Sequence, residues 1–208
     1  MIALGGWPAS VGGSALVALV ELDAVQVGQF MISRPLVLGS LLGLLFGIPQ
    51  VGVALGLCCE LFSIDDLPVG DRLPLNASIA VAAAMLVARG PRPLPVAVAL
   101  PVGLTAGWAH QNLEAALRLR RRVFCGLAEK SIRRGKVPPF GSMTVKSLVE
   151  QAAVTFAVVL TCVLVVGPIL NGAWSYAPRS VAGALGFSWT LAPWLGLGVA
   201  LHALRIGT

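Results

Sequence analysis

The sequence predicts an all-α polytopic integral membrane protein with broken or re-entrant helices and a cytoplasmic amphipathic segment. Of its 208 residues, 57% are hydrophobic and only 12% are charged, and the mean hydropathy is +0.87. Soluble proteins contain about 25% charged residues, so a water-soluble fold of this composition would lack polar surface. The lipid bilayer is therefore the expected solvent. No linker divides the chain, which predicts a single membrane-embedded domain over residues 1–208.

The N-terminal stretch is expected to be a retained first membrane segment. It has no Lys or Arg before its apolar run and continues directly into Glu21 and Asp23. A secretory signal begins with positive charge, so this stretch does not have the pattern of a signal.

The remaining apolar runs differ in how well they suit a membrane crossing, which needs roughly 20 residues. Residues 148–170 are the best candidate, and residues 94–113 are the next. Three other runs are short or are interrupted by Gly and Pro: residues 36–63, residues 77–88, and residues 181–206 with an expected break near Pro193. Such interruptions are typical of discontinuous helices along a transport pathway. They are equally typical of close packing and kinks in membrane helices.

The basic residues are concentrated in one segment. Nine of the fifteen fall between Arg118 and Lys146, so by the positive-inside rule residues 118–146 are expected to form a cytoplasmic loop. Within it, Leu119, Val123 and Leu127 recur at helical spacing. This pattern indicates an amphipathic helix at the membrane surface, held by anionic lipid or by an acidic protein. No fold is evident that would present the run to nucleic acid, which is not an expected partner.

The acidic residues lie mostly in the first third of the chain. Six of the nine stand between Glu21 and Asp71. Glu60 follows an apolar run directly, and a charge inside a membrane costs at least about 2.5 kcal/mol unless a cavity or a partner compensates. Arg34 is the natural opposite charge, and a purely structural pair of these two residues would explain the same pattern.

The residues that commonly bind metals or act as nucleophiles do not form a recognisable pattern. The four cysteines include no C-x-x-C pair, and neither His110 nor His202 has a second ligand at helical spacing. No Ser/His/Asp or Cys/His arrangement is evident. The sequence therefore predicts no metal, no cofactor and no catalytic residue.

Three consecutive motifs carry a resemblance to a known family. The stretch GQFMISRPLVLGSLLGLLFG is followed by GVALGLCCEL and then by LPVGDRLPLNASIA. Together they resemble the membrane IIC subunit of the mannose/fructose/sorbose family of bacterial phosphotransferase systems. The likeness is strong over residues 20–90, the core motif region, and looser over most of the rest. It departs at Ile48, where the family commonly has an acid.

The resemblance implies a membrane permease of the bacterial cytoplasmic (inner) membrane. A IIC subunit pairs with a IID membrane subunit, binds a hexose-type sugar and translocates it, coupled to phosphorylation by a cytoplasmic IIB protein. The expected cytoplasmic partners are the IIA and IIB phosphocarrier proteins. The donor residue is on a partner, so the chain is not expected to be an enzyme on its own. Assembly with further copies of itself stays open.

Sugar hydroxyls are met by carboxylates and amides, which accept and donate hydrogen bonds in pairs. The side chains of this kind that are predicted to contact sugar are Asp23, Gln26, Gln29, Glu60 and Asn76. The residues that are predicted to orient the site are Ser33, Arg34, Pro68 and Gly70.

Two other functions remain open. One is a non-transporting scaffold or regulatory subunit with the family fold, which the short C-terminal region and Ile48 would suit. The other is a secondary carrier coupled to protons or ions through Asp23 or Glu60.

Overall fold

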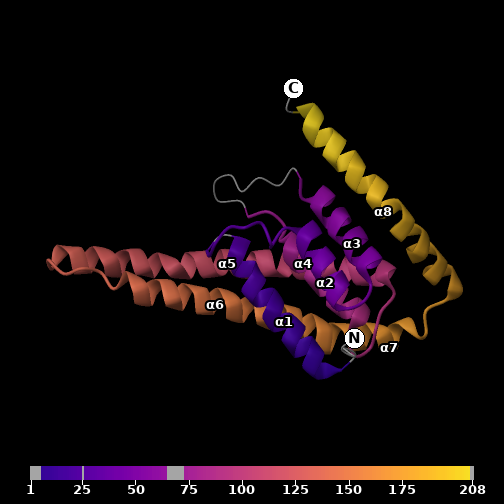
Figure 1. Ribbon diagram of the computed structural model, residues 1–208, viewed down its shortest axis with the longest axis horizontal. Coiled ribbons are helices and arrows are strands. Elements are labelled where there is room, and N and C mark those ends of the chain that lie inside the picture. The colour runs from indigo at the N-terminus through magenta and orange to yellow at the C-terminus, as the bar shows by residue number, and fades with distance from the viewer. Residues whose placement is uncertain (1–5, 25, 65–72, 207–208) are drawn as a thin grey trace.

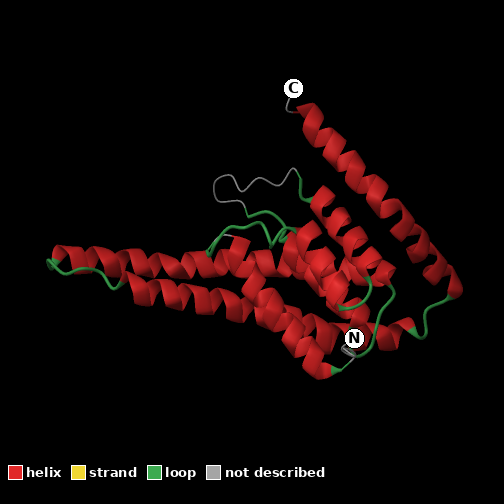
Figure 2. Ribbon diagram, in the orientation of Figure 1, coloured by secondary structure: helices red, strands yellow, loops and turns green. Residues whose placement is uncertain are grey.

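The structure is a computed structural model that describes residues 6–24, 26–64 and 73–206. Within these ranges every regular element is helical (Figure 2), which confirms the predicted fold class. The elements are α1 (Trp7–Glu21), η1 (Leu22–Ala24), α2 (Pro35–Leu45), α3 (Pro49–Phe62), α4 (Ala77–Arg89), α5 (Val96–Arg133), α6 (Phe140–Thr161), η2 (Cys162–Val166), α7 (Gly167–Trp174) and α8 (Arg179–Ile206). Figure 1 shows their arrangement.

Helix α4 forms the centre of the molecule. Every residue from Ile79 to Ala88 is buried, and α4 packs against α1, α2, α3, α5 and α6. Its sequence is rich in Ala, and small residues allow helices in a membrane to approach closely. A Cβ on Gly107 of α5 would lie 2.5 Å from the Asn76 carbonyl oxygen. The short apolar stretch at residues 77–88 is therefore a core helix, covered by other helices rather than by lipid.

Helices α2 and α3 form a tight hairpin whose interface is made of glycine. Gly39 and Gly43 of α2 face Gly52 of α3, and a Cβ on Gly52 would collide with the Gly39 carbonyl oxygen. The connecting turn contains Gly47 with φ of 71°, a left-handed conformation that glycine adopts without strain. The helices have 11 and 14 residues and are too short to cross about 30 Å of hydrocarbon. The Gly and Pro residues within 36–63 thus divide this stretch into two short helices and also allow these helices to pack closely.

Replacing Gly52 with Ala is expected to lower the free energy of unfolding by about 1–3 kcal/mol, because the new methyl group overpacks the α2–α3 interface. Gly12→Ala in α1 is the matched control, since a Cβ there meets nothing within 4 Å. Thermal unfolding of the purified variants in detergent measures the difference. Equal unfolding temperatures for the two variants would contradict this view of the hairpin.

Helices α5 and α6 form a long antiparallel hairpin whose outer part, residues 118–146, projects from the other helices (Figure 1). This part is called the arm. The helix predicted within residues 118–146 is present as the outer part of α5, which continues to Arg133, and helix begins again at Phe140. The cytoplasmic location of the arm stays a prediction. Glu–Arg pairs four residues apart support α5, as in Glu129–Arg133.

The tip of the arm begins where α5 ends in a Schellman motif. The Lys136 N–H donates to the Ser131 carbonyl oxygen at 3.0 Å, and the Gly135 N–H donates to the Ile132 carbonyl oxygen at 2.9 Å. Gly135 has φ of 65°, as the position after a helix end commonly requires. A helix of 38 residues is about 57 Å long, so α5 is longer than the hydrocarbon is thick.

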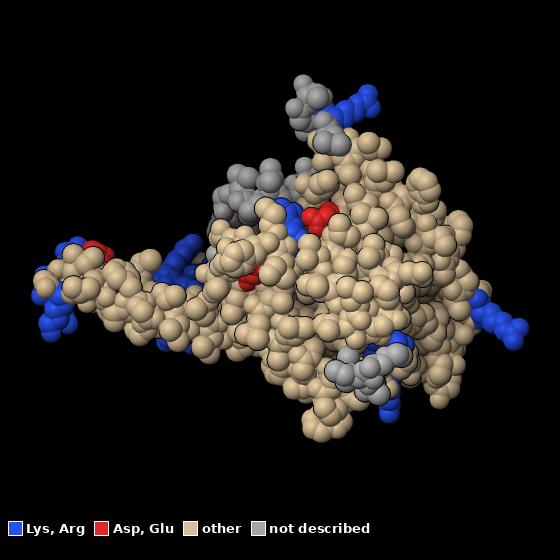
Figure 3. Space-filling model, viewed as in Figure 1, with Lys and Arg blue, Asp and Glu red and all other residues tan. Residues whose placement is uncertain are grey.

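Two helical segments of the described chain are long and apolar enough to cross a membrane, Phe140–Trp174 and Arg179–Ala203. The first contains the best predicted span. Residues 96–113 belong to α5, where the polar run from His110 to Asn112 interrupts the apolar sequence. Large apolar side chains on α8 are exposed, among them Trp194 at 70%. In Figure 3 charged side chains lie along the arm, at the edges of the molecule and in a small group near the middle of this face. The exposed apolar side chains of α8 are suited to lipid.

The expected break near Pro193 is absent. Helix α8 runs from Arg179 to Ile206 with Pro193 inside it. Proline removes one backbone hydrogen bond, but a full break would expose several unpaired backbone groups to hydrocarbon, at a cost of several kcal/mol each. A continuous helix is the less costly solution.

Candidate functional site

Asp23 holds the loop that connects η1 to α2. Its Oδ1 accepts a hydrogen bond from the Phe30 N–H at 2.7 Å, and its Oδ2 accepts from the N–H groups of Ile32 at 2.8 Å and Ser33 at 3.3 Å. The loop includes Gln29, whose φ of 56° lies in the left-handed region. A carboxylate that accepts three backbone bonds stabilises this unusual backbone. Asp23 is buried, and Gln29 is exposed.

Ser33 connects the same loop to the core. It is buried, and its carbonyl oxygen accepts a hydrogen bond from the Ser78 hydroxyl in the first turn of α4. Asn76, which caps α4, stands two residues before Ser78. The loop therefore lies over the N-terminal end of the central helix, and Asp23, Ser33 and Asn76 are gathered around it.

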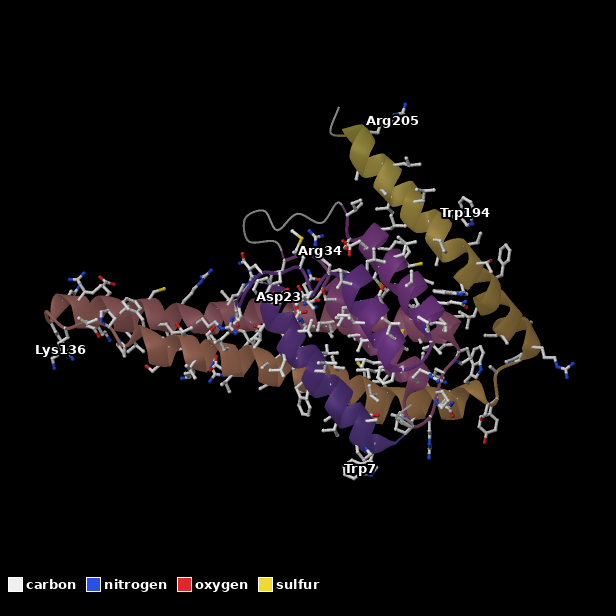
Figure 4. The ribbon with its side chains drawn as sticks, in the orientation of Figure 1. Trp7, Asp23, Arg34, Lys136, Trp194 and Arg205 are labelled. Atoms are coloured by element: carbon white, nitrogen blue, oxygen red, sulfur yellow. The ribbon has the colours of Figure 1, made fainter. Side chains whose placement is uncertain are left out.

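Arg34 and Glu60 form the ion pair that the sequence suggests. Arg34 Nη1 donates to Glu60 Oε1 at 3.1 Å, and the Leu36 N–H donates to Glu60 Oε2 at 3.3 Å. Glu60 thus joins the end of α3 to the first turn of α2, where the helix dipole favours negative charge. The Glu60 side chain is 26% exposed and the Arg34 side chain 60% exposed. Asp23 and Arg34 are labelled in Figure 4, near the two ends of the loop.

Asn76 lies at the centre of a buried polar network. Its Oδ1 accepts from the Ile79 N–H at 3.0 Å, which caps α4. That bond fixes the orientation of the amide, so Nδ2 is the donor toward Glu21 Oε1 at 2.5 Å and His110 Nδ1 at 3.2 Å. Because Nδ1 accepts, His110 is the neutral tautomer with its proton on Nε2. Nε2 lies 2.9 Å from Thr155 Oγ1.

The network joins four helices through residues that are far apart in the sequence. Glu21 is on α1, Asn76 precedes α4, His110 is on α5 and Thr155 is on α6. His110 and Thr155 are fully buried. Sequence reasoning missed Glu21, His110 and Thr155 as site residues. The available signal was their polarity inside apolar runs, since polar side chains at membrane depth are costly and usually functional.

A polar cavity of about 140 Å³ lies beside this network. Its lining residues are Glu21, Ala24, Gln26, Glu114, Arg118, Arg121 and Gln151. Among the predicted sugar contacts, Gln26 is the one that lines it. Within the described part of the chain, no group of three or more His, Cys, Asp or Glu could hold a metal ion.

The predicted site residues therefore fall into three places. Asp23 and Ser33 hold the loop next to the N-terminal end of α4, which Asn76 caps; the Arg34–Glu60 pair lies at the α2 end of the loop; and Gln26 lines the cavity. Gln29 is exposed on the loop itself. Pro68 and Gly70 lie outside the described residues.

Comparisons with known proteins identify the fold and the family. Two solved structures share the fold. One is titled "Structure of membrane protein", with a TM-score of 0.76 and 18% identity over 94% of this chain and 79% of that chain. The other is titled "CryoEM Structure of Mannose Transporter ManYZ and Microcin E492 (MceA) complex", with a TM-score of 0.64 and 19% identity over the same shares, 94% and 79%. A search of curated proteins gave no match.

The family assignment comes from the sequence model described as "PTS system sorbose-specific iic component", which matches residues 13–206. The match includes the loop, the cavity and the buried network. The chain therefore belongs to the sorbose-specific IIC family of the phosphotransferase system, whose members are membrane-embedded sugar permease subunits.

Proposed function

We propose that the chain is the permease subunit that binds a hexose-type sugar and translocates it, coupled to phosphorylation by a cytoplasmic IIB protein. The observation that carries the proposal is the family match over residues 13–206. The cluster of polar side chains among apolar helices also supports the proposal, because a polar solute needs such surroundings inside a membrane. No nucleophile is required of this chain, because the phosphoryl group resides on a partner.

The proposed sugar contacts are those of the motif region: Asp23, Gln26, Gln29, Glu60 and Asn76. Several keep free hydrogen-bonding capacity. An ionised carboxylate offers about four acceptor positions, of which Glu60 uses two and Asp23 three. Sugar hydroxyls can therefore be bound by carboxylates that are already held in place. Ser33 and Arg34 position the loop and Glu60, and Pro68 and Gly70 are assigned the same role from the motif.

The proposed partners and location follow from the family and the charge distribution. A IID membrane subunit is supported by the fold shared with a structure of the mannose transporter ManYZ, and the soluble IIA and IIB proteins complete the system. The positive-inside rule places the basic arm in the cytoplasm of a bacterial cell, at the inner membrane.

Reconstitution into vesicles together with the IID subunit tests the proposal. With phosphorylated IIB inside the vesicles, sugar phosphate is expected to accumulate, and without the donor it is not. Uptake that is driven by an ion gradient and is indifferent to the donor would identify a secondary carrier. Capture of IIB without any uptake would identify a scaffold, and either result would overturn the proposed coupling.

A further inference from the structure

The hydrogen bonds of the buried network run in one direction, which the cap of α4 determines. The Ile79 N–H donates to Asn76 Oδ1 at 3.0 Å. The amide NH₂ group is therefore the donor to Glu21 and to His110 Nδ1. A neutral histidine that accepts at Nδ1 carries its proton on Nε2, and this proton is donated to Thr155 Oγ1 at 2.9 Å. Each bond in the chain thus determines the role of the next group.

The members of the network differ in whether a ligand can reach them. His110 and Thr155 are fully buried, so neither side chain can touch a sugar. Asn76 is half-buried and is one of the proposed sugar contacts. The two buried residues can therefore influence a bound sugar only through Asn76.

The bonds that Asn76 already makes limit what it can offer to a sugar. An amide side chain has two protons to donate and two acceptor positions on its oxygen. Glu21 and His110 take the two protons, and the cap takes one acceptor position. One acceptor position of Oδ1 is left for a sugar hydroxyl. Its direction depends on the plane of the amide, and His110 contacts this amide through Nδ1.

His110 is itself held from two helices. Gly107 lies one turn before it on α5, and a Cβ at Gly107 would lie 2.5 Å from the Asn76 carbonyl oxygen. This close approach of α5 to the start of α4 brings the imidazole within reach of the amide. On its other side the ring donates to Thr155 of α6. A ring that is bonded at both nitrogens is fixed in position, and a fixed neighbour is what holds a ligand-binding side chain in place.

We propose that His110 is a positioning residue of the sugar site, which holds the amide of Asn76, and that Thr155 acts through His110 by holding its ring. The proposal rests on the proposed function, because it acts through a proposed sugar contact. It adds one residue of α5 and one of α6 to a site that the motif region otherwise supplies.

Thr155→Val removes the acceptor for His110 Nε2 and keeps the branched shape of the side chain. Phosphorylation of mannose, fructose and sorbose is measured in vesicles with the IID subunit and phosphorylated IIB. For the sugar that the wild type uses, KM is expected to rise about fivefold, as for the loss of one neutral hydrogen bond. The maximal rate per folded protein should stay unchanged, because the bond holds sugar equally before and during the reaction.

Two further substitutions in α6 serve as controls. Thr155→Ser restores the hydroxyl group and is expected to restore the KM of the wild type. Thr161→Val makes the same chemical change at the exposed last residue of the helix and should leave KM unaltered. A lower yield of folded Thr155→Val protein with an unchanged KM would show a structural role alone and would overturn the proposal.

A double substitution tests whether Thr155 acts through His110. In His110→Asn the amide oxygen can take the place of Nδ1, since both atoms are bonded to Cγ, but the shorter side chain no longer reaches Thr155. Thr155→Val is therefore expected to cause no further rise of KM in this background. A further fivefold rise would show that Thr155 acts independently of His110, and would contradict the proposal.

Nitrogen NMR of the purified protein with isotope-labelled histidine tests the direction of the bonds. The chain has two histidines, and His202→Gln leaves the signals of His110 alone. A nitrogen with a proton and one without have well separated chemical shifts, so the protonated atom is identified directly. The proton is expected on Nε2. A proton on Nδ1, in either the other tautomer or the charged ring, would overturn the proposal.

The outcomes separate the positioning role from the proposed function. Phosphorylation by the wild type with the same KM in Thr155→Val would overturn the positioning role and leave the permease function standing. Absence of phosphorylation of all three sugars by the wild-type assembly would overturn the proposed function, and with it the role of His110 in sugar binding.

Discussion

Replacing Glu60 with Gln is expected to reduce phosphorylation-dependent uptake at least about 30-fold. Glu60 accepts from two donors, Arg34 Nη1 and the Leu36 N–H, one at each oxygen. A glutamine has only one oxygen, so its NH₂ group must face one of these donors. Loss of a charge-assisted bond costs about 2 kcal/mol, which corresponds to roughly a 30-fold change. Initial rates of uptake into vesicles measure the effect.

The control for Glu60→Gln is Glu129→Gln on the arm. Glu129 also pairs with an arginine, Arg133, at 2.7 Å, but both side chains are well exposed and belong to one helix. Its removal is expected to leave uptake unchanged. Membrane insertion, followed by the amount of folded protein that is purified, should be normal in both variants. Normal uptake with Glu60→Gln would remove Glu60 from the sugar site.

Replacing Asn76 with Ala is expected to abolish uptake and to lower the free energy of unfolding by about 3 kcal/mol. The substitution removes the cap of α4, which contributes about 1 kcal/mol. It also leaves Glu21 Oε1 and His110 Nδ1 without their donor in a buried place, where an unpaired group costs about 1–3 kcal/mol. Thermal unfolding in detergent and vesicle uptake measure the two effects.

The Asn76→Asp variant separates the effect of losing the cap of α4 from the effect of losing the hydrogen bonds to the buried network. An aspartate can still accept from the Ile79 N–H, but it cannot donate to Glu21 or His110. This variant should therefore lose uptake despite its intact cap. Asn112→Ala is the control, because Asn112 is exposed and donates only locally, to the Trp108 carbonyl oxygen. Wild-type stability and uptake in both Asn76 variants would contradict a central role for the network.

The features that could be predicted from the sequence are those that depend on the residues of one segment alone. Composition indicates the membrane, and the glycines of residues 36–63 indicate the short hairpin of α2 and α3. The Arg34–Glu60 pair follows from the cost of an isolated charge in an apolar region. Each of these depends on local sequence or on a single opposite charge.

The arm and α8 show how far local signals reach. The helical spacing of Leu119, Val123 and Leu127 predicts the helix that α5 contains, but it does not predict that α5 and α6 pack into one projecting hairpin. Pro193 predicts a break from local sterics, whereas the lipid surroundings of a long helix favour continuity.

The buried network could not be predicted, because its pairing depends on tertiary structure. Glu21, Asn76, His110 and Thr155 come from four elements, and no sequence spacing relates them. The sequence around His110 gives no sign of a role for it, whereas the structure places it between the amide of Asn76 and the hydroxyl of Thr155. Packing of α1, α5 and α6 around α4 determines these contacts.

The most direct test of the proposed sugar site is a structure of the wild-type protein with its IID subunit and a bound monosaccharide, determined in lipid nanodiscs. Sugar density is expected within hydrogen-bonding distance of the cluster that surrounds the loop and the cavity, with Glu60, Asn76 or Gln26 among its contacts. Density only at a place remote from these residues, such as the outer face of α8 or the tip of the arm, would show that sugar binds elsewhere.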